Sequence, residues 1–301
     1  MGKTSEQRPR VIVQILGGLG NQMFCYAAAR RLAIVHDAQL VLDTTSRLIN
    51  DPYRRRFMLD RFRIEGEKLP LSEGCHRGWR KARRSIMRRV ARRSGGMTGR
   101  YLFELGRGFV PEMLNVKIDG FVNLDGLWQD PRYFADVEET IREDFRLSMD
   151  VHQDARQVGD RMAEEENSVS VHLRSYGEIP HENTPMRMEH FFLERALKRV
   201  REVIETPRLY VFTDNEDWAR KQLEQVDVER ATIVGVNDGR GDDGAVLDMW
   251  LMSRCRAHVI SNSTFSWWGA WLNPNPEKLV VGPHSGLPGN PEAFPDDWVR
   301  V

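Results

Sequence analysis

Short apolar runs and longer helical patterns alternate from the start of the chain. Residues 11–16 form an apolar run rich in β-branched side chains, and a glycine-rich stretch at residues 17–20 ends it. Residues 21–36 repeat apolar side chains at helical spacing, and residues 38–43 are again apolar. A strand, a helix and a strand in this order predict a βαβ unit with a parallel sheet.

The same alternation returns in the second half of the chain. Residues 168–174 and 208–214 have the composition of buried strands, and residues 188–204 have the periodicity of an amphipathic helix. Further strands are predicted at residues 231–235, 257–261 and 278–283, and further helices at residues 151–166, 216–226, 245–255 and 265–271. We therefore predict an α/β fold of two Rossmann-like lobes, residues 1–150 and 151–301, facing a central cleft.

The middle of the first lobe is less regular. Residues 120–126 predict a strand and residues 131–145 a helix. Residues 79–90 predict an amphipathic helix, because Trp79, Ala82, Ile86 and Val90 recur at helical spacing. The helix is basic, since the stretch from Arg77 to Arg100 contains ten Lys or Arg and no acid. Such a helix can hold a protein at an anionic membrane surface, and a solvated basic face is the alternative.

Composition excludes several classes of protein. An apolar fraction of 41% is enough for buried cores, and a formal net charge of zero gives no support for binding to nucleic acid. Three cysteines far apart in the sequence fit neither a disulfide framework nor a zinc site. The polar start has no apolar region of a signal peptide behind it, and no run approaches 18 apolar residues. We expect a cytoplasmic protein, with peripheral attachment to the inner face of the membrane as the alternative.

The first candidate site is the glycine-rich loop GGLGNQMF. Its glycines, including Gly18, let the backbone approach a ligand closely, and the following helix N-terminus favours negative charge. The spacing matches neither the dinucleotide-binding fingerprint nor the P-loop. A tight turn between strand and helix is therefore the alternative interpretation.

Two further candidates follow predicted strands. His172 and Arg174 are two residues apart in VHLR, so their side chains share a face if the strand continues. Arg174 can donate two hydrogen bonds to a phosphate, and a structural salt bridge is the alternative. Asp214, in FTDN, can accept hydrogen bonds from ribose hydroxyls or a base edge, and an N-cap is the alternative there.

The most informative stretch is SNSTFSWWGAWL at residues 261–272. Four small polar residues end an apolar strand and open an aromatic helix, which is where open α/β sheets bind phosphates or nucleotides. Trp267, Trp268 and Trp271 have helical spacing and are expected to pack inward. No histidine or acidic cluster has the spacing of a metal site, so we expect no metal.

In this order the segments resemble the bacterial α-1,2-fucosyltransferases of glycosyltransferase family 11, and the resemblance runs nearly end to end. The motifs that carry it are GGLGNQMF, RRFMLDRFRI, VNLDGLWQDPRYF, SVSVHLR, YVFTD, LDMWLMSRCRAHVISNSTFSWWGAWLNP and KLVVGP. The resemblance implies a GT-B fold, GDP-fucose bound in the C-terminal lobe, a glycan acceptor, no divalent metal and inversion at the anomeric carbon. The predicted lobes then become an N-terminal acceptor-side lobe and a C-terminal lobe for the nucleotide sugar.

The resemblance also implies roles for individual residues. Arg174 matches the first arginine of an H-x-R-R-x-D motif and would hold the β-phosphate, and His172 would lie near the guanine. Asp214 matches the first acid of an F-S-D-D segment and would contact guanine or ribose. Asn21 would point at the diphosphate and the reacting centre. The residues that would line the diphosphate are Ser263, Thr264 and Phe265.

Two departures from the family pattern weaken these expectations. Ser175 stands where the family has a second arginine, and Tyr176 and Gly177 follow where its acid is expected. Asn215 replaces the second acid of the F-S-D-D segment. A transferase that uses another GDP-sugar, or a non-catalytic protein that binds a nucleotide or glycan, are therefore the alternatives to fucosyl transfer.

The expected reaction is direct displacement at the anomeric carbon of the donor by an acceptor hydroxyl, O2 of a terminal galactose, with GDP leaving. Arg174 and Asn21 would stabilise the charge that develops on the β-phosphate. A general base must reach the acceptor hydroxyl. Glu178 is the acid nearest to the altered motif, and His181 and Glu182 are rivals in the same segment. The acceptor glycan can be free or lipid-linked.

Overall fold

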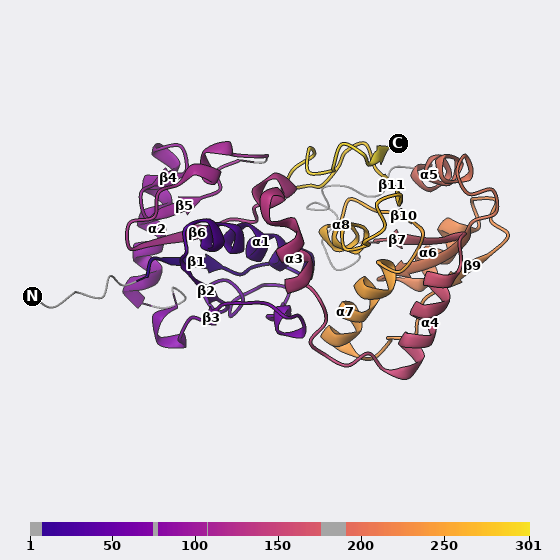
Figure 1. Ribbon diagram of the computed structural model, residues 1–301, viewed down its shortest axis with the longest axis horizontal. Coiled ribbons are helices and arrows are strands. Elements are labelled where there is room, and N and C mark those ends of the chain that lie inside the picture. Colours follow the sequence, from indigo (N-terminus) through magenta and orange to yellow (C-terminus); the bar gives the residue numbers. More distant parts are fainter. Residues whose placement is uncertain (1–7, 75–77, 107, 176–190) are drawn as a thin grey trace, which may run out of the picture. The chain divides into compact units, whose positions relative to one another are not determined.

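The computed structural model describes residues 8–74, 78–106, 108–175 and 191–301. The chain divides into two compact units, Met1–Ser148 and Met149–Val301, and each is described here by itself. Each unit contains one six-stranded sheet with helices packed against it (Figure 1). No helix among the described residues is long and apolar enough to cross a membrane.

The first unit is built on a sheet in which all neighbouring strands are parallel except the last pair at one edge. From one edge to the other its strands are β3 (Glu67–Lys68), β2 (Gln39–Asp43), β1 (Arg10–Gln14), β6 (Phe121–Asp125), β5 (Tyr101–Phe103) and β4 (Met97–Thr98). Its helices are α1 (Leu19–Val35), α2 (Gly78–Arg93) and α3 (Glu138–Asp144), with the 3-10 turns η1 (Leu59–Arg61), η2 (Leu71–Glu73), η3 (Pro111–Asn115), η4 (Pro131–Tyr133) and η5 (Ala135–Val137).

Helix α1 is the centre of the first unit's core. Phe24, Ala28 and Leu32 are fully buried, and so are residues on its other faces such as Cys25 and Tyr26. A helix that is apolar on nearly every side must be covered on every side. The predicted first βαβ unit is confirmed, and the helix begins at Leu19, two residues earlier than predicted.

Helix α2 confirms the predicted basic helix but buries an unexpected face. Arg84 and Arg88 turn inward to Asp125 at the end of β6. Trp79, at 66% exposure, and Ile86, at 59%, lie on the opposite side. The large apolar side chains Trp79, Ile86 and Val90 therefore face solvent while two arginines lie inside, which reverses the usual amphipathic arrangement.

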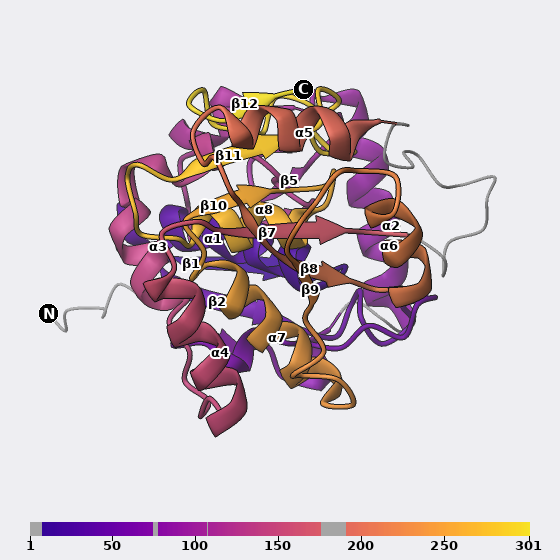
Figure 2. The same cartoon turned by 90° about the vertical axis from the view of Figure 1, so that its right-hand side faces the viewer.

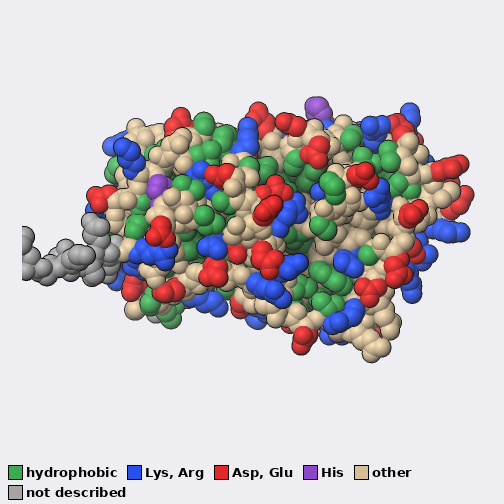
Figure 3. All heavy atoms as spheres, in the orientation of Figure 1, with side chains coloured by type: hydrophobic (Ala, Val, Ile, Leu, Met, Phe, Trp, Pro, Cys, Tyr) green, Lys and Arg blue, Asp and Glu red, His purple; other side chains and the backbone are tan. Residues whose placement is uncertain are grey.

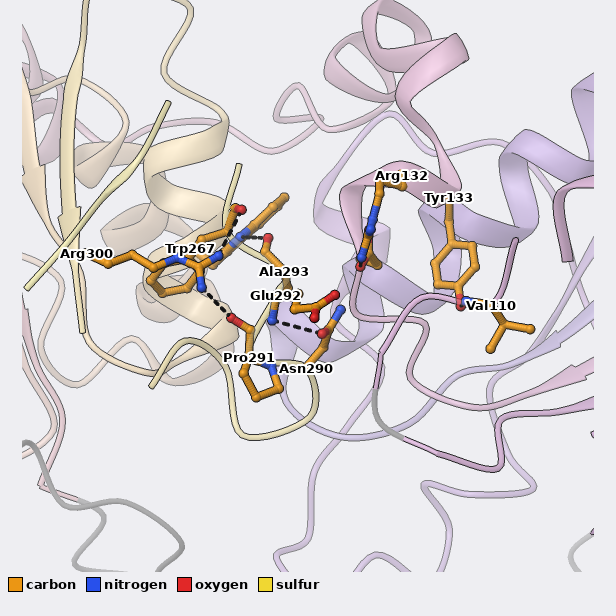
Figure 4. A network of polar contacts seen from close by, with 11 residues as sticks. Val110, Arg132, Tyr133, Trp267, Asn290, Pro291, Glu292, Ala293 and Arg300 are labelled. Atoms are coloured by element: carbon orange, nitrogen blue, oxygen red, sulfur yellow. Dashed lines mark hydrogen bonds and ion pairs between the residues drawn. The ribbon is translucent and has the colours of Figure 1, made fainter. Parts of the chain in front are cut away.

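The predicted helix at residues 131–145 is wrong in its first half. This stretch makes the turns η4 and η5, and only Glu138–Asp144 is α-helical. Phe134 and Val137 have φ angles of −139° and −129°, outside the helical range. The break packs Tyr133 and Phe134 into the core, and the Tyr133 hydroxyl accepts a 2.8 Å hydrogen bond from the Val110 N–H (Figure 4).

The second unit contains a sheet whose neighbouring strands are all parallel. Its order can be followed in Figure 2: β12 (Val299–Arg300), β11 (Leu279–Gly282), β10 (Ala257–Val259), β7 (Ser168–Leu173), β8 (Arg208–Thr213) and β9 (Ala231–Ile233). Its helices are α4 (Gln153–Glu164), α5 (Phe192–Arg201), α6 (Glu216–Leu223), α7 (Gly241–Met252) and α8 (Thr264–Trp271).

The helices of the second unit cover both faces of its sheet. Side chains of α5 and α6 pack with Val169, Val171 and neighbouring strand residues in one cluster. Side chains of α4 and α7 pack with Tyr210 and Phe212 on the other face, where Phe265 of α8 joins them. A parallel sheet covered on both faces is the doubly wound arrangement of Rossmann-like lobes.

The tryptophans of α8 are buried, as predicted. Trp267 and Trp268 are fully buried and Trp271 is 5% exposed. The indole Nε1 of Trp267 donates a 3.0 Å hydrogen bond to the Ala293 carbonyl, and Arg300 Nη1 donates one of 3.1 Å to the Pro291 carbonyl (Figure 4). The segment that follows β11 is thus fixed behind α8.

Candidate active site

The carboxyl ends of β7, β8 and β10 lie at the same edge of the second unit's sheet, because all three strands are parallel. The chain runs from β7 outward to β8 and β9, then returns to β10 on the other side of β7. The strand order therefore reverses between β7 and β10. Ligands of open α/β sheets bind at such a reversal, outside the carboxyl ends of the strands.

His172 and Ser261 meet across this reversal. The Nδ1 atom of His172 and the hydroxyl of Ser261 share a hydrogen bond of 2.9 Å, and the imidazole lies 5.4 Å from the Phe265 ring. His172 is 5% exposed, and this burial, together with the charge of Arg174, lowers its pKa to about 3. The imidazole is therefore neutral at physiological pH and presents one donor and one acceptor.

Arg174 and Asp214 meet across the neighbouring pair of strands. Arg174 Nη1 lies 3.1 Å from Asp214 Oδ2, and the backbone N–H of Ser175 donates a 2.7 Å hydrogen bond to Asp214 Oδ1. One carboxylate thus receives a guanidinium and a backbone N–H from the turn after β7. The contact to Ser175 uses only its backbone, so it does not depend on which side chain stands at this position.

Helix α8 directs its N-terminus to the same edge. The Ser263 hydroxyl accepts a 3.3 Å hydrogen bond from the Phe265 N–H and caps the helix. Ser266 turns back and donates to the Ser263 carbonyl at 3.2 Å. The capping interpretation of this stretch is thus correct for Ser263, and the positive end of the helix dipole lies beside Ser261 and Thr264.

In the first unit, the glycine-rich loop follows β1. Gly17 has a φ of +76°, and a Cβ atom there would lie 2.5 Å from Asn21 Nδ2. Gly18 is the N-cap residue of α1, contributes no side-chain cap, and a Cβ there would meet no atom within 4 Å. The loop thus needs glycine at 17 for its own geometry and has open space at 18.

Asn21 and Gln22 have different environments. Gln22 is fully buried; its Nε2 donates to the carbonyls of Gly17 at 3.0 Å and Arg56 at 2.7 Å, and its Oε1 accepts from Met58 N–H at 3.0 Å. Asn21 is half-buried, and its Oδ1 accepts a 2.8 Å hydrogen bond from Gln129 Nε2. Gln22 therefore fixes the loop, and the half-buried Asn21 lies nearer its surface.

The pair Asn21 and Gln129 also crosses a strand reversal. In the first sheet the chain runs outward from β1 to β2 and β3, crosses to the opposite edge at β4, and returns inward through β5 to β6, which lies on the other side of β1. Asn21 follows β1, and Gln129 follows β6. Each unit therefore has a hydrogen bond across its own reversal that involves a residue the sequence had indicated, His172 in one unit and Asn21 in the other.

Sequence reasoning missed the partners Gln22 and Gln129, whereas Ser261 belongs to the polar strand end that it had singled out. Gln129 lies in VNLDGLWQDPRYF, one of the motifs that carry the family resemblance, and this was the signal in the sequence that could have identified it. The proposed base Glu178 and its rivals His181 and Glu182 lie outside the described residues. In the part of the chain that is described, no group of three or more His, Cys, Asp or Glu has the arrangement of a metal site.

A second polar group missed by sequence reasoning joins α4, α7 and the segment after β9. His152 Nδ1 accepts from the Ala155 N–H at 3.3 Å, so its Nε2 carries the proton and donates to Asn237 Oδ1 at 2.9 Å. Asn237 Nδ2 then donates to Asp248 Oδ1 at 2.7 Å. Burial raises the pKa of Asp248 to about 6. The group anchors the N-terminus of α4 to α7.

Comparison with known proteins decides the family. The model of glycosyl transferase family 11 matches residues 117–285, more than half of the chain. The chain belongs to glycosyltransferase family 11. The O-antigen biosynthesis glycosyltransferase WbnK of Escherichia coli is 30% identical over 95% of this chain and 98% of its own. An alpha-1,2-colitosyltransferase of the same organism is 28% identical over 97% and 98%.

A solved structure agrees with the fold. NodZ, an alpha-1,6-fucosyltransferase from Bradyrhizobium whose crystal was soaked with GDP-fucose, superposes with a TM-score of 0.52 at 17% identity over 89% of this chain and 94% of that chain. The predicted fold class, GT-B-like with two Rossmann-like lobes, is confirmed. The family 11 member described here is a glycosyltransferase.

Proposed function

We propose that this glycosyltransferase moves L-fucose from GDP-fucose to O2 of a terminal galactose on a glycan acceptor, with inversion and without a metal ion. In this proposal residues 151–301 bind the donor and residues 1–150 hold the acceptor. The observation that carries it is the meeting of His172, Arg174 and Asp214 with the N-terminus of α8 at one strand reversal.

The donor diphosphate has two sources of positive potential at that edge. Arg174 can donate charge-assisted hydrogen bonds to the β-phosphate, and α8 presents the positive end of its dipole beside Ser263 and Thr264. Asp214 holds the Arg174 guanidinium and keeps an acceptor oxygen for a ribose hydroxyl or a guanine N–H. Neutral His172, beside Phe265, suits contact with an uncharged purine.

The proposed step is a single displacement. The acceptor oxygen forms a bond to the anomeric carbon, the bond from that carbon to the β-phosphate oxygen breaks, and GDP leaves. The negative charge that develops on the β-phosphate would be stabilised by Arg174 and by the N-terminus of α8, which lie at the same edge of the second unit's sheet. Asn21 of the first lobe is proposed as a further donor. The acceptor proton passes to a general base, for which Glu178 is proposed ahead of His181 and Glu182.

A second donor has a specific observation in its favour. The colitosyltransferase that resembles this chain over nearly its whole length transfers a sugar other than fucose. Colitose is fucose without its 3-hydroxyl, so both sugars can be carried by the same GDP-binding residues. A protein group that hydrogen-bonds the 3-hydroxyl would distinguish the two donors. With the deoxy sugar that buried group would be left unpaired, which weakens binding of the deoxy sugar by about 1–3 kcal/mol.

Calorimetry followed by a GDP-release assay tests the proposal. The chain is titrated with GDP, GDP-fucose, GDP-colitose and GDP-mannose, and the linkage of any product is determined by NMR. We expect GDP and GDP-fucose to bind, and fucose to appear on O2 of galactose. Absence of GDP binding contradicts every transferase interpretation, and faster turnover of GDP-colitose selects the second donor. An Arg174→Ala variant that keeps normal GDP release contradicts the phosphate role.

Contact with a membrane surface is part of the proposal. The outer face of α2 combines exposed Trp79, Ile86 and Val90 with the exposed arginines Arg83 and Arg89. Apolar side chains flanked by arginines suit the boundary between anionic headgroups and acyl chains. On the face in Figure 3, acidic and basic side chains are mixed, whereas α2 contains no acidic residue. A lipid-linked acceptor would be met at such a surface.

A further inference from the structure

A basic hollow of about 450 Å³ lies in the first unit beside the glycine-rich loop. Gly17 and Asn21 line one side of it, and the turn after β2 and the start of α2 line the others. Its charged lining residues are Arg47, Arg55, Lys81, Arg84 and Asp51. Four cations therefore face a single carboxylate.

The single carboxylate in this lining is already used by the backbone. Asp51 Oδ1 accepts hydrogen bonds from the N–H groups of Tyr53 at 2.9 Å and Arg55 at 3.2 Å. These bonds shape the turn from Asp51 to Arg55. They leave Asp51 poorly placed to neutralise the cations across the hollow, so the lining keeps an excess of positive charge.

The acid behind the hollow is shared by several donors. Asp125 is 1% exposed and accepts two hydrogen bonds from Arg88, of 2.7 and 2.6 Å, and one from the Tyr101 hydroxyl. Arg84 Nε reaches the same carboxylate at 3.3 Å. Burial alone would raise the pKa of Asp125, but Arg88 and the charge of Arg84 outweigh it and lower that pKa. The Asp125 carboxylate thus accepts hydrogen bonds from two guanidinium groups.

The cations nearest the hollow are left incompletely paired. Arg84 Nη2 is buried and has no hydrogen-bond partner among the described residues. Arg47 makes no hydrogen bond or ion pair within the described part of the chain, and burial followed by the charges of Arg84 and Arg88 lowers its pKa. Two further acids at this edge also accept from backbone N–H groups: Glu104 from Leu127 and Trp128, and Asp43 from Thr45 and Ser46. Buried cations without a counter-charge are costly unless a ligand supplies one.

We propose that this hollow binds an anionic group, a phosphate or a carboxylate, carried by the glycan acceptor, with Arg47 and Arg84 as its partners and Lys81 at the rim. This rests on the proposed function, which assigns the first lobe to the acceptor. The donor diphosphate is assigned to Arg174 and α8 in the other lobe, so it does not need these arginines. Asn21 lines the same hollow, and the anion would therefore be carried by a sugar close to the reacting galactose.

The test compares three acceptors that differ in charge. They are the methyl glycoside of galactosyl-β-1,3-N-acetylglucosamine, the 1-phosphate of the same disaccharide, and galactosyl-β-1,3-glucuronate. Each is assayed with GDP-fucose against the wild type, Arg47→Gln, Lys81→Gln and the matched control Lys117→Gln, whose side chain is exposed elsewhere in this lobe. We expect one anionic acceptor to have a KM about tenfold below that of the neutral one, and Arg47→Gln to remove this difference.

The arms of the experiment separate the outcomes. Preference for the 1-phosphate or for the glucuronate identifies the anion. Equal KM values for all three acceptors overturn the proposal. An Arg47→Gln variant whose KM rises for GDP-fucose alone also overturns it, because the donor would then occupy the hollow. Arg47→Gln should not lower Tm, since it removes an unpaired cation, whereas loss of a merely structural arginine would lower it.

Binding measured without donor keeps the two proposals apart. The disaccharide 1-phosphate and the glucuronate are titrated calorimetrically into wild type and Arg47→Gln. Anion-dependent binding that is lost in Arg47→Gln supports the hollow even if no fucose is transferred, in which case the proposed function alone fails. No binding of either anion together with normal transfer to the neutral acceptor overturns the anion site alone. No binding and no transfer contradict both.

Discussion

The Arg174 guanidinium lies 3.1 Å from the Asp214 carboxylate, so two residues expected to contact different parts of a GDP-sugar contact each other. The ion pair holds Arg174 at the edge of the sheet, while the Ser175 N–H holds the carboxylate at 2.7 Å. In the proposed donor site, Asp214 would therefore act on the diphosphate through Arg174 in addition to any contact of its own.

The first prediction concerns this ion pair. Asp214→Asn keeps an acceptor for the Ser175 N–H but removes the charge that orients Arg174. We expect GDP affinity to fall about tenfold, which corresponds to the loss of one charge-assisted hydrogen bond. Calorimetry with GDP measures it, with the exposed neighbour Asp217→Asn as the control. Equal affinities in wild type and Asp214→Asn would show that the pair has no part in binding.

The second prediction concerns pH and the two buried histidines. Burial lowers the pKa of both His172 and His258 to about 3, against 6.5 in the unfolded chain. Their stabilising effect is complete above pH 6.5 and is lost as pH falls toward 3, because only the unfolded chain takes up protons in that window. At pH 5 each histidine should reduce the free energy of unfolding by about 2 kcal/mol.

Thermal unfolding at pH 7 and pH 5 measures this effect. His258 is held by Asn273 Nδ2, which donates to its Nε2 at 2.8 Å, and shares a 2.8 Å hydrogen bond with Ser170. His258→Gln keeps polar atoms in the site but cannot titrate, so its Tm should fall less between the two pH values. A variant with the full wild-type pH dependence would refute the assignment to His258.

The third prediction separates two neighbouring glycines. Gly17→Ala forces a Cβ into the Asn21 side chain at a φ of +76°, so we expect a loss of about 1–2 kcal/mol of stability together with lower activity. Gly18→Ala meets no atom within 4 Å and should leave Tm unchanged. If Gly18→Ala nevertheless weakens GDP-fucose turnover, a ligand approaches that backbone closely. A Gly17→Ala variant as stable and active as wild type contradicts the steric argument.

The fourth prediction concerns membrane contact. Replacing Trp79 and Ile86 by Ser together with Arg83 and Arg89 by Gln should abolish flotation with anionic liposomes, since each basic residue contributes about 1 kcal/mol at such a surface. Arg84 and Arg88 must be kept, because they bind buried Asp125 and their loss would damage the lobe. Liposomes of zwitterionic lipid serve as the control. Unchanged flotation of the fourfold variant with anionic liposomes rejects the contact.

Sequence predicted the strand-end residues well because parallel strands bring their carboxyl ends to one edge whatever the loop details. His172, Arg174, Asp214 and Ser263 could be found in this way. The sequence pattern could not predict that Asp214 would bind Arg174, since that contact joins residues 40 positions apart through the pairing of β7 with β8. Nor could periodicity distinguish the buried Gln22 from its neighbour Asn21.

Helix α2 shows the same limit more sharply. The sequence predicted a basic amphipathic helix without saying which of its side chains are inside. Arg84 and Arg88 lie inside because Asp125, far away in the sequence, is buried at the end of β6. A single buried acid at long sequence separation can thus override the hydrophobic pattern of a helix. The incompletely paired cations around it, Arg47 among them, could not be recognised without the structure.

The hydrogen bond from Trp267 to the Ala293 carbonyl joins α8 to a segment that is synthesised later. Helix α8 gains this contact only after residues 290–300 have been made, and the strand pairing of Val299 with Val281 then holds the segment. The first lobe contains its own sheet and can fold while the second is being synthesised. The proposed acceptor half of the enzyme would then exist before the proposed donor half.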